Sequence, residues 1–496
     1  MRAPLLLVLL SSLAGCAGAP PPAPAPVAAA TIPPAPPPPP PAVDDWRFSQ
    51  PKPGQPAPLD YPEVQTGKLD NGLSLYVVRR PVGIVSLSLI AKSGGSSVPA
   101  GKSGLAGLTV RMMTEGTTAH SPLALAEAAE ALGASIEESA GRDFVRLGIT
   151  TLKDDMRRGL ALLAEVATKP SFAPKELERV RREWLDGIEG ERQNPSRLAS
   201  LVGLRLLLGP VAGAPVNGSQ HDVTALSRDD LVRFHKENFV PENLALIVVG
   251  DVALDDVRPL AKDLLGRMQG HAPAVVPAPL PSEPTGGKVV IVDRPGSVQT
   301  ALFIGQRFPK RSEPGYETRE LMNDVVGGLF TSRLNANLRE KHAYTYGVRS
   351  VDIATRDWGA FAVMTSVRTD TTDDALREAF AELDGARDPK LGRPFSDDEL
   401  NTGRADLKQS LGASLADAGE IADRVENLFI EGLAPDYYRK YPAMLDSADT
   451  AAIAKESARI APNQSVVVVV GDRASIEPKL KARALTVVPA EESLLD

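Results

Sequence analysis

The sequence predicts an α+β protein whose folded part consists of two similar halves, and three observations support this prediction. Segments with the period of strands alternate with segments of helical period along the chain. One apolar run ends on Gly250-Asp251 and another on Gly471-Asp472, and Pro241 and Pro462 precede the runs at the same offset of 221 positions. Residues 271–287, "HAPAVVPAPLPSEPTGG", form a Pro- and Gly-rich linker between the halves. The shared offset indicates an internal duplication.

Local patterns predict the elements of each half. Asn71-Gly72 marks a turn into an alternating strand, and Ser121 is a candidate helix N-cap. The continuous apolar run at 244–249 is typical of a strand buried on both faces. The other predicted elements are strands at 83–94 and 143–152, helices at 104–116, 121–136, 154–167 and 177–195, two strands within 288–308, further helices, and a closing strand before Gly471.

Composition and charge exclude some classes of protein. The chain has 496 residues, of which 43% are hydrophobic and 24% charged, which is ordinary for a globular protein of more than one domain. The formal net charge is −8, so the summed field repels nucleic acid and anionic lipid headgroups. We therefore expect no nucleic-acid partner.

The N-terminus has the pattern of an export signal. Arg2 precedes an apolar run from Leu5 to Leu10, which is too short to span a bilayer. Cys16 ends the motif "LAGC", which resembles the bacterial lipoprotein signal, in which this cysteine carries the lipid. Cys16 is the single cysteine of the chain, so no internal disulfide can form. Because Ala17 follows instead of an aspartate, the resemblance implies an outer-membrane anchor facing the periplasm.

The predicted organisation follows from these patterns. Residues 20–43 are dominated by Pro and Ala and predict an extended polyproline spacer. The predicted segments are a lipoprotein signal at 1–16, a proline-rich tether at 17–58, an N-terminal domain at 59–270, the linker at 271–287 and a C-terminal domain at 288–496.

Two motifs carry a resemblance to a known family. The motifs are "GKSGLAGL…EGT" in the first half and "GGLFTSRLNANLREKHAYTYGV" in the second. From about Tyr61 to the C-terminus, the chain resembles the insulinase, pitrilysin and mitochondrial-processing-peptidase superfamily of zinc peptidases, in the short bacterial form that pairs two chains. The resemblance implies that each half is a mostly antiparallel sheet with helices packed on it, one half of a peptidase clamshell.

The family's zinc site is the point at which this sequence departs from the pattern. Active relatives carry H-x-x-E-H on a helix, where two histidines bind Zn²⁺ and the glutamate acts as general base. When "GLAGLTVRMMTEGT" is laid on that motif, Gly107, Val110 and Arg111 take the three positions, and Gly187 takes that of a third ligand, a glutamate. Arg111 has no lone pair for a metal, so we expect no metal on this chain. The resemblance implies zinc in a partner subunit.

The five histidines do not suggest a replacement site. They are His120, His221, His235, His271 and His342, and no two have the spacing of a helical metal pair. Neighbouring Asp186 and Glu189 point away from the direction of Gly187 on a helix.

The second motif retains the residues that active relatives use to hold substrate. The resemblance places the family's arginine and tyrosine at Arg339 and Tyr346, although Ala343-Tyr344 departs from the usual residues between them. An arginine can hold a peptide carbonyl or oxyanion, and a tyrosine hydroxyl can donate a hydrogen bond to the same centre. The alternative is that both residues are only structural, with Arg339 on the surface of a helix and Tyr346 half-buried in a strand.

These expectations lead to one main hypothesis and two alternatives. The main hypothesis is a lipid-anchored subunit, not an enzyme by itself, that pairs with an H-x-x-E-H subunit and offers Arg339 and Tyr346 to unfolded peptide substrates in trans. The first alternative is a structural or peptide-binding scaffold without a peptidase role. The second is a peptidase with a relocated metal site.

Overall fold

The structure is a computed structural model that describes residues 59–274, 276–282, 288–483, 485–490 and 492–495. The predicted signal, Cys16 and the tether lie outside these residues. The described part contains no helix long and apolar enough to cross a membrane.

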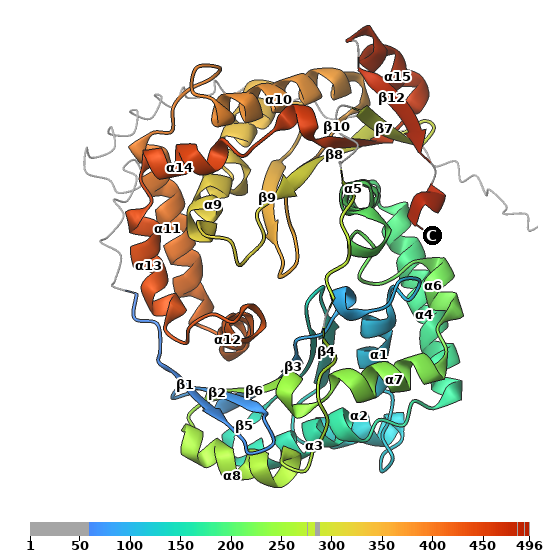
Figure 1. Cartoon of the computed structure of the whole chain (residues 1–496), viewed down its shortest axis with the longest axis vertical. Coiled ribbons are helices and arrows are strands. Elements are labelled where there is room, and N and C mark those ends of the chain that lie inside the picture. The colour runs from blue at the N-terminus through green and yellow to red at the C-terminus, as the bar shows by residue number, and fades with distance from the viewer. Residues whose placement is uncertain (1–58, 275, 283–287, 484, 491, 496) are drawn as a thin grey trace, which may run out of the picture. The chain divides into compact units, whose positions relative to one another are not determined.

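The first sheet has six strands in the described chain, in the order β1-β2-β6-β3-β5-β4 (Figure 1). β6 runs parallel to β2 and antiparallel to β3, and every residue of β6 is buried, as its apolar run predicts. The strands are β1 Val64–Lys68, β2 Ser74–Arg79, β3 Ile84–Ala91, β4 Ile136–Ala140, β5 Val145–Leu152 and β6 Leu244–Gly250.

The second sheet repeats this arrangement, in the order β12-β7-β11-β8-β10-β9. β11 runs parallel to β7 and antiparallel to β8, so it has the same place as β6 in the first sheet. The strands are β7 Lys288–Asp293, β8 Gln299–Phe308, β9 Val348–Ala354, β10 Gly359–Arg368, β11 Val466–Gly471 and β12 Thr486–Ala490. The predicted duplication and the α+β fold class are confirmed.

The helices follow the same order in both halves. The first half contains α1 Leu105–Met113, α2 Pro122–Glu130, α3 Met156–Thr168, α4 Pro174–Gln193, α5 Pro195–Ala212, α6 Gln220–Ala225, α7 Arg228–Asn238 and α8 Leu254–Leu265. The second contains α9 Tyr316–Asn323, two π-helical turns, η5 Asp324–Gly328 and η6 Asn335–Lys341, then α10 Thr372–Arg387, α11 Asp397–Ser414, α12 Ala418–Glu431, α13 Tyr437–Ser447, α14 Thr450–Ser457 and α15 Arg473–Ala482.

The two halves exchange one helix each. α5 belongs to the first half of the sequence but packs on β8 and β11 of the second sheet, and α12 packs on β3 and β6 of the first sheet (Figure 1). Gly203 of α5 lies so close to Phe303 of β8 that a Cβ atom would sit 2.2 Å from the ring. In return, Glu426 of α12 accepts a 2.6 Å hydrogen bond from Ser88 of β3 in a buried contact. The faces of the two sheets are therefore covered reciprocally.

Some element boundaries differ from the sequence-based predictions. α1 ends at Met113, and not at Gly116, because the chain turns there: the Thr114 hydroxyl donates to the Arg111 carbonyl and Gly116 has a φ of 100°. The strands β1, β4, β9, β10 and β12 were not predicted. Four of them, β1, β4, β9 and β12, are edge strands, where no continuous apolar run marks them, and β10 lies between β8 and β9.

Candidate functional site

The predicted metal-site residues lie on two helices that pack together, α1 and α4, beside the edge strand β4. Gly107, Val110 and Arg111 are on α1 and Gly187 is on α4. Gly107 and Arg111 are four residues apart and share a face of α1. Val110 is buried in the core of the first half.

The space beside Gly107 is filled by an aromatic ring. A Cβ atom on Gly107 would lie 2.8 Å from Cζ2 and 3.0 Å from Cη2 of Trp184 on α4. The Trp184 indole N–H donates a 2.7 Å hydrogen bond to the carbonyl of Asn217, which fixes the ring in this place. A histidine at Gly107 would therefore need the indole to move.

Gly187 has the opposite environment. A Cβ atom there would meet no heavy atom within 4 Å. Gly187, Arg111 and Trp184 line a hollow of about 260 Å³. The residues predicted at the ligand positions offer no nitrogen, oxygen or sulfur lone pair to a zinc ion, so they do not fit that metal.

Arg111 is held by carboxylates of its own half. Its guanidinium forms ion pairs with Glu115 at 2.8 Å and with Glu138 of β4 at 3.5 Å. Glu115 is buried and also binds Arg179 of α4. Burial raises the pKa of Glu138 and the charge of Arg111 opposes that shift. Arg111 thus neutralises two acidic groups between α1, β4 and α4, which gives it a structural role.

Four of the five histidines, all but His221, are engaged in local contacts. His120 Nδ1 lies 2.7 Å from Glu165, His235 Nε2 lies 2.8 Å from the carbonyl of Ala167, and His271 Nδ1 lies 3.0 Å from Glu242. The His342 ring stacks on Tyr344. Within the described ranges, no group of three or more His, Cys, Asp or Glu residues is placed to hold a metal ion.

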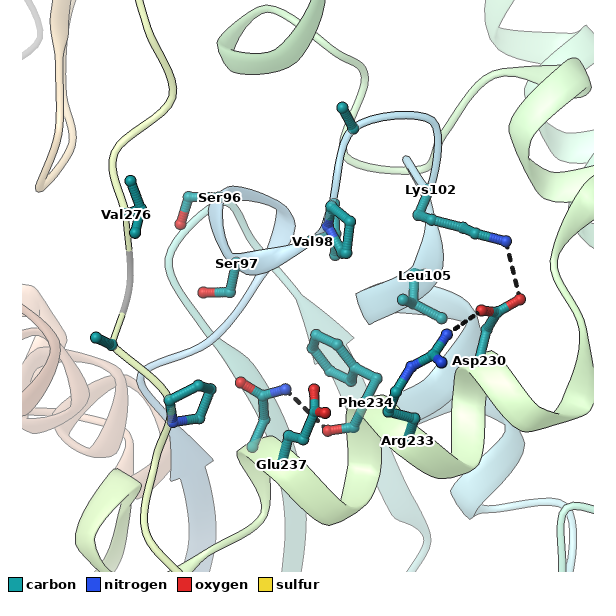
Figure 2. Close-up of a pocket in the computed structure, with 15 residues that line it drawn as sticks. Ser96, Ser97, Val98, Lys102, Leu105, Asp230, Arg233, Phe234, Glu237 and Val276 are labelled. Carbon is teal, nitrogen blue, oxygen red and sulfur yellow. Dashed lines mark hydrogen bonds and ion pairs between the residues drawn. The ribbon is translucent and has the colours of Figure 1, made fainter.

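A larger hollow of about 420 Å³ lies between the loop before α1 and helix α7 (Figure 2). Its central carboxylate, Asp230, is paired with Lys102 at 2.9 Å and with Arg233 at 2.5 Å. The Asp230 carboxylate also accepts a hydrogen bond from the backbone N–H of Ser227, the N-cap residue, and so completes the capping box of α7. Because these charged groups neutralise one another, we assign them a structural role: they hold the loop before α1 against α7.

Arg339 and Tyr346 lie in the second half; the Arg339 side chain is 28% exposed, whereas Tyr346 is almost fully exposed. The Arg339 guanidinium lies 3.8 Å from the centre of the Phe330 ring and pairs with the adjacent Glu340 at 2.8 Å. Tyr346 is 94% exposed, in the turn between η6 and β9. It is neither half-buried nor part of a strand, so the alternative of a half-buried strand tyrosine is wrong for this residue.

The turn that carries Tyr346 is itself well anchored. The Asn335 side chain accepts a 3.0 Å hydrogen bond from the Val348 N–H and donates a 2.8 Å bond to the Val348 carbonyl. The Thr365 hydroxyl donates to Thr345 at 2.9 Å. The backbone is therefore fixed while the phenol projects into solvent. In the described chain, no hydrogen bond, ion pair or ring contact links Arg339 or Tyr346 to Gly107, Arg111 or Gly187.

Sequence reasoning missed two residues of these sites, Trp184 and Phe330. Trp184 precedes Gly187 by three positions, so it lies on the same helical face one turn earlier. A large aromatic side chain on that face, opposite a glycine on the neighbouring helix, is the signal that could have predicted it. Phe330 has no comparable signal, since it lies in the turn before η6 and its contact with Arg339 spans nine positions of the chain.

The contrast between the two glycines gives a testable prediction. Gly107→His should lower the free energy of unfolding by about 1–3 kcal/mol, because the new side chain must displace the indole. Gly187→Glu should be neutral or stabilise by up to about 1 kcal/mol, since it enters open space and improves helix propensity. Urea denaturation of both variants measures this difference. Equal stability of the two would mean that Trp184 does not fill the place beside Gly107.

The first half has two helices, α1 and α4, that lack the metal ligands beside an edge strand, and the second half carries Arg339 and an exposed Tyr346. Together with the two similar α+β halves, these features define a homologue of clamshell metallopeptidases. Residues 77–201 match the family model of insulinase (peptidase family M16), and residues 225–407 match that of the peptidase M16 inactive domain. The chain belongs to the insulinase superfamily.

Individual relatives agree with this assignment. An uncharacterized zinc protease of Rickettsia bellii is 25% identical over 351 residues, which cover 69% of this chain and 82% of that protein. The crystal structure of a peptidase M16 inactive domain from Pseudomonas fluorescens superposes with a TM-score of 0.74 at 26% identity and covers 82% of this chain and 98% of that one. A chain of complex III2 from Candida albicans has the same fold, with a TM-score of 0.72 at 14% identity, and covers 86% of this chain and 100% of that chain.

Proposed function

We propose that this chain is a non-catalytic, lipid-anchored subunit that pairs with a zinc-binding H-x-x-E-H subunit of the same superfamily. One observation carries the proposal: the Trp184 ring fills the space beside Gly107, the first of the metal-site positions, whereas Tyr346 and the Phe330 ring that lies against Arg339 are exposed. A chain that keeps only the substrate-holding residues is useful when another chain supplies the reactive centre. The match to the M16 inactive domain supports this division of roles.

The proposed chemistry of this chain is binding and orientation. The Arg339 guanidinium would hold a peptide carbonyl and the negative charge that develops on its oxygen, and the Tyr346 hydroxyl would donate to the same oxygen. The partner's zinc would supply the activated water. Unfolded peptides are the expected substrates, because extended segments can pair with a sheet edge such as β4.

A reconstitution experiment tests the proposed function. Peptidase activity on an unstructured fluorogenic peptide, with zinc present, is measured for this chain alone, for a candidate H-x-x-E-H subunit alone and for the mixture. We expect activity that depends on the mixture. Activity of this chain alone would overturn the proposal, and co-purification without activity would favour a scaffold.

The scaffold alternative has one observation in its favour, the shared fold with a chain of complex III2. A scaffold would need neither Arg339 nor Tyr346 at a substrate path. Substitution of Arg339 would then leave every activity of the assembled complex unchanged.

The lipid anchor is a separate proposal with its own test. We infer that Cys16 carries the lipid and that the chain lies at the outer membrane, facing the periplasm. Cys16→Ala should move nearly all of the protein from the membrane fraction to the soluble fraction, as measured by immunoblotting after a high-salt wash. A variant that stays with the washed membranes would contradict the anchor.

A further inference from the structure

A hollow of about 800 Å³ lies on the second sheet beside helix α5. α5 covers β8 and β11 but reaches little of β9 and β10. The side chains of Val351 and Ile353 on β9 and of Met364 on β10 share this face, since residues two apart in a strand point the same way and Met364 pairs with Arg349. With Phe303 of β8 they make an apolar, partly open floor.

The same place in the first half is built differently. There, Arg146 of β5 and Glu137 of β4 occupy the matching face and form an ion pair at 3.3 Å. Arg146 also binds Asp423 of α12 at 2.7 Å, which ties the helix over this face. The duplicated fold therefore closes this surface with charges in one half and leaves it apolar and open in the other.

The charges around the hollow have one sign. Arg197 of α5 and Arg349 of β9 line it, and no aspartate or glutamate is among its described lining residues. Arg197 is already paired with Glu191 at 3.3 Å. Arg349 is exposed and has no ion pair in the described part of the chain. An unneutralised cation beside an apolar floor favours a ligand that has a carboxylate next to an apolar group.

The hollow adjoins the residues assigned to substrate. Phe330, whose ring lies under the Arg339 guanidinium, is part of its lining, and so is Gly347, the residue after Tyr346. A peptide that reached Arg339 and Tyr346 would therefore have its neighbouring side chains over this floor.

We propose that this hollow is a peptide subsite that takes a bulky apolar side chain and pairs Arg349 with an acidic residue next to it. The inference rests on the proposed function for its role in proteolysis, but binding itself needs only this chain. It assigns a substrate class, extended peptides with an apolar residue followed or preceded by Asp or Glu.

Fluorescence anisotropy of labelled, unstructured peptides tests this with the full chain in detergent and no partner subunit. The reference peptide contains Leu-Glu, and its two matched peptides contain Ser-Glu and Leu-Lys. We expect Arg349→Glu to weaken the binding of the Leu-Glu peptide about fivefold or more at low salt and to strengthen the binding of the Leu-Lys peptide. Met364→Asp should weaken the binding of the Leu-Glu peptide. Arg267 is an exposed arginine of the first half, and Arg267→Glu should leave the binding of all three peptides unchanged.

The outcomes separate this inference from the proposed function. Equal binding of the three peptides, unchanged binding by Arg349→Glu, or no measurable binding would overturn the subsite, even if the mixed subunits are active. Selective binding with an inactive mixture would support the subsite and count against the peptidase role. Circular dichroism of each variant confirms that it is folded.

Discussion

Arg339→Ala is expected to lower kcat/KM of the assembled two-chain peptidase by about 100-fold, the usual cost of losing one donor to a developing oxyanion. The guanidinium lies over the exposed Phe330 ring, and its recorded ion pair is with the neighbouring Glu340. Its removal therefore breaks no link between elements of the fold, and the thermal stability of the chain should change little. Steady-state kinetics with the mixed subunits measures the effect.

Matched variants identify which property of Arg339 matters. Arg339→Lys keeps the charge but not the planar fork, so it should recover only part of the lost rate. Tyr346→Phe should lower kcat/KM less than Arg339→Ala does. It should leave stability unchanged, because the 94% exposed phenol makes no contact that holds the fold together. Arg267→Ala serves as a control for loss of an exposed arginine elsewhere. An unchanged rate for Arg339→Ala would return this residue to a surface role.

Gly203→Val is expected to lower the free energy of unfolding by about 3 kcal/mol. Gly203 is the contact point of α5 with the second sheet, and its Cβ would lie 2.2 Å from the Phe303 ring in a buried layer. Because α5 belongs to one half and packs on the other, both halves should unfold in a single transition at lower denaturant. Urea titrations followed by fluorescence and by circular dichroism measure this.

A second helical glycine provides the control for Gly203→Val. Gly190 lies in α4, is exposed, and a Cβ there would meet nothing within 4 Å. Gly190→Ala should therefore stabilise the chain by up to about 1 kcal/mol through helix propensity alone. Two separate transitions, or Gly203→Val as stable as the parent, would show that the exchanged helices do not couple the halves.

The sequence by itself determined the features that depend on local patterns. The closing strands β6 and β11 are continuous apolar runs that can be recognised in isolation, and the shared offset of Gly250 and Gly471 predicts their equivalent places. The turn at Asn71-Gly72 and the cap at Ser121 depend on residues close in sequence. The family resemblance rested on short motifs of the same local kind.

Tertiary structure alone decided which side chains from distant segments pack together and which surfaces stay open. Four features depend on segments that are far apart in sequence or on which side chains cover a surface. They are the exchange of α5 and α12 between the sheets, the Trp184 ring beside Gly107, the exposure of Tyr346 and the apolar floor below Arg349. Hydrophobic period predicts that a helix has an apolar face, but it carries no information on which sheet that face will meet. The physical reason is that packing matches volumes and charges across the whole fold, whereas a local pattern records only the conformation of its own segment.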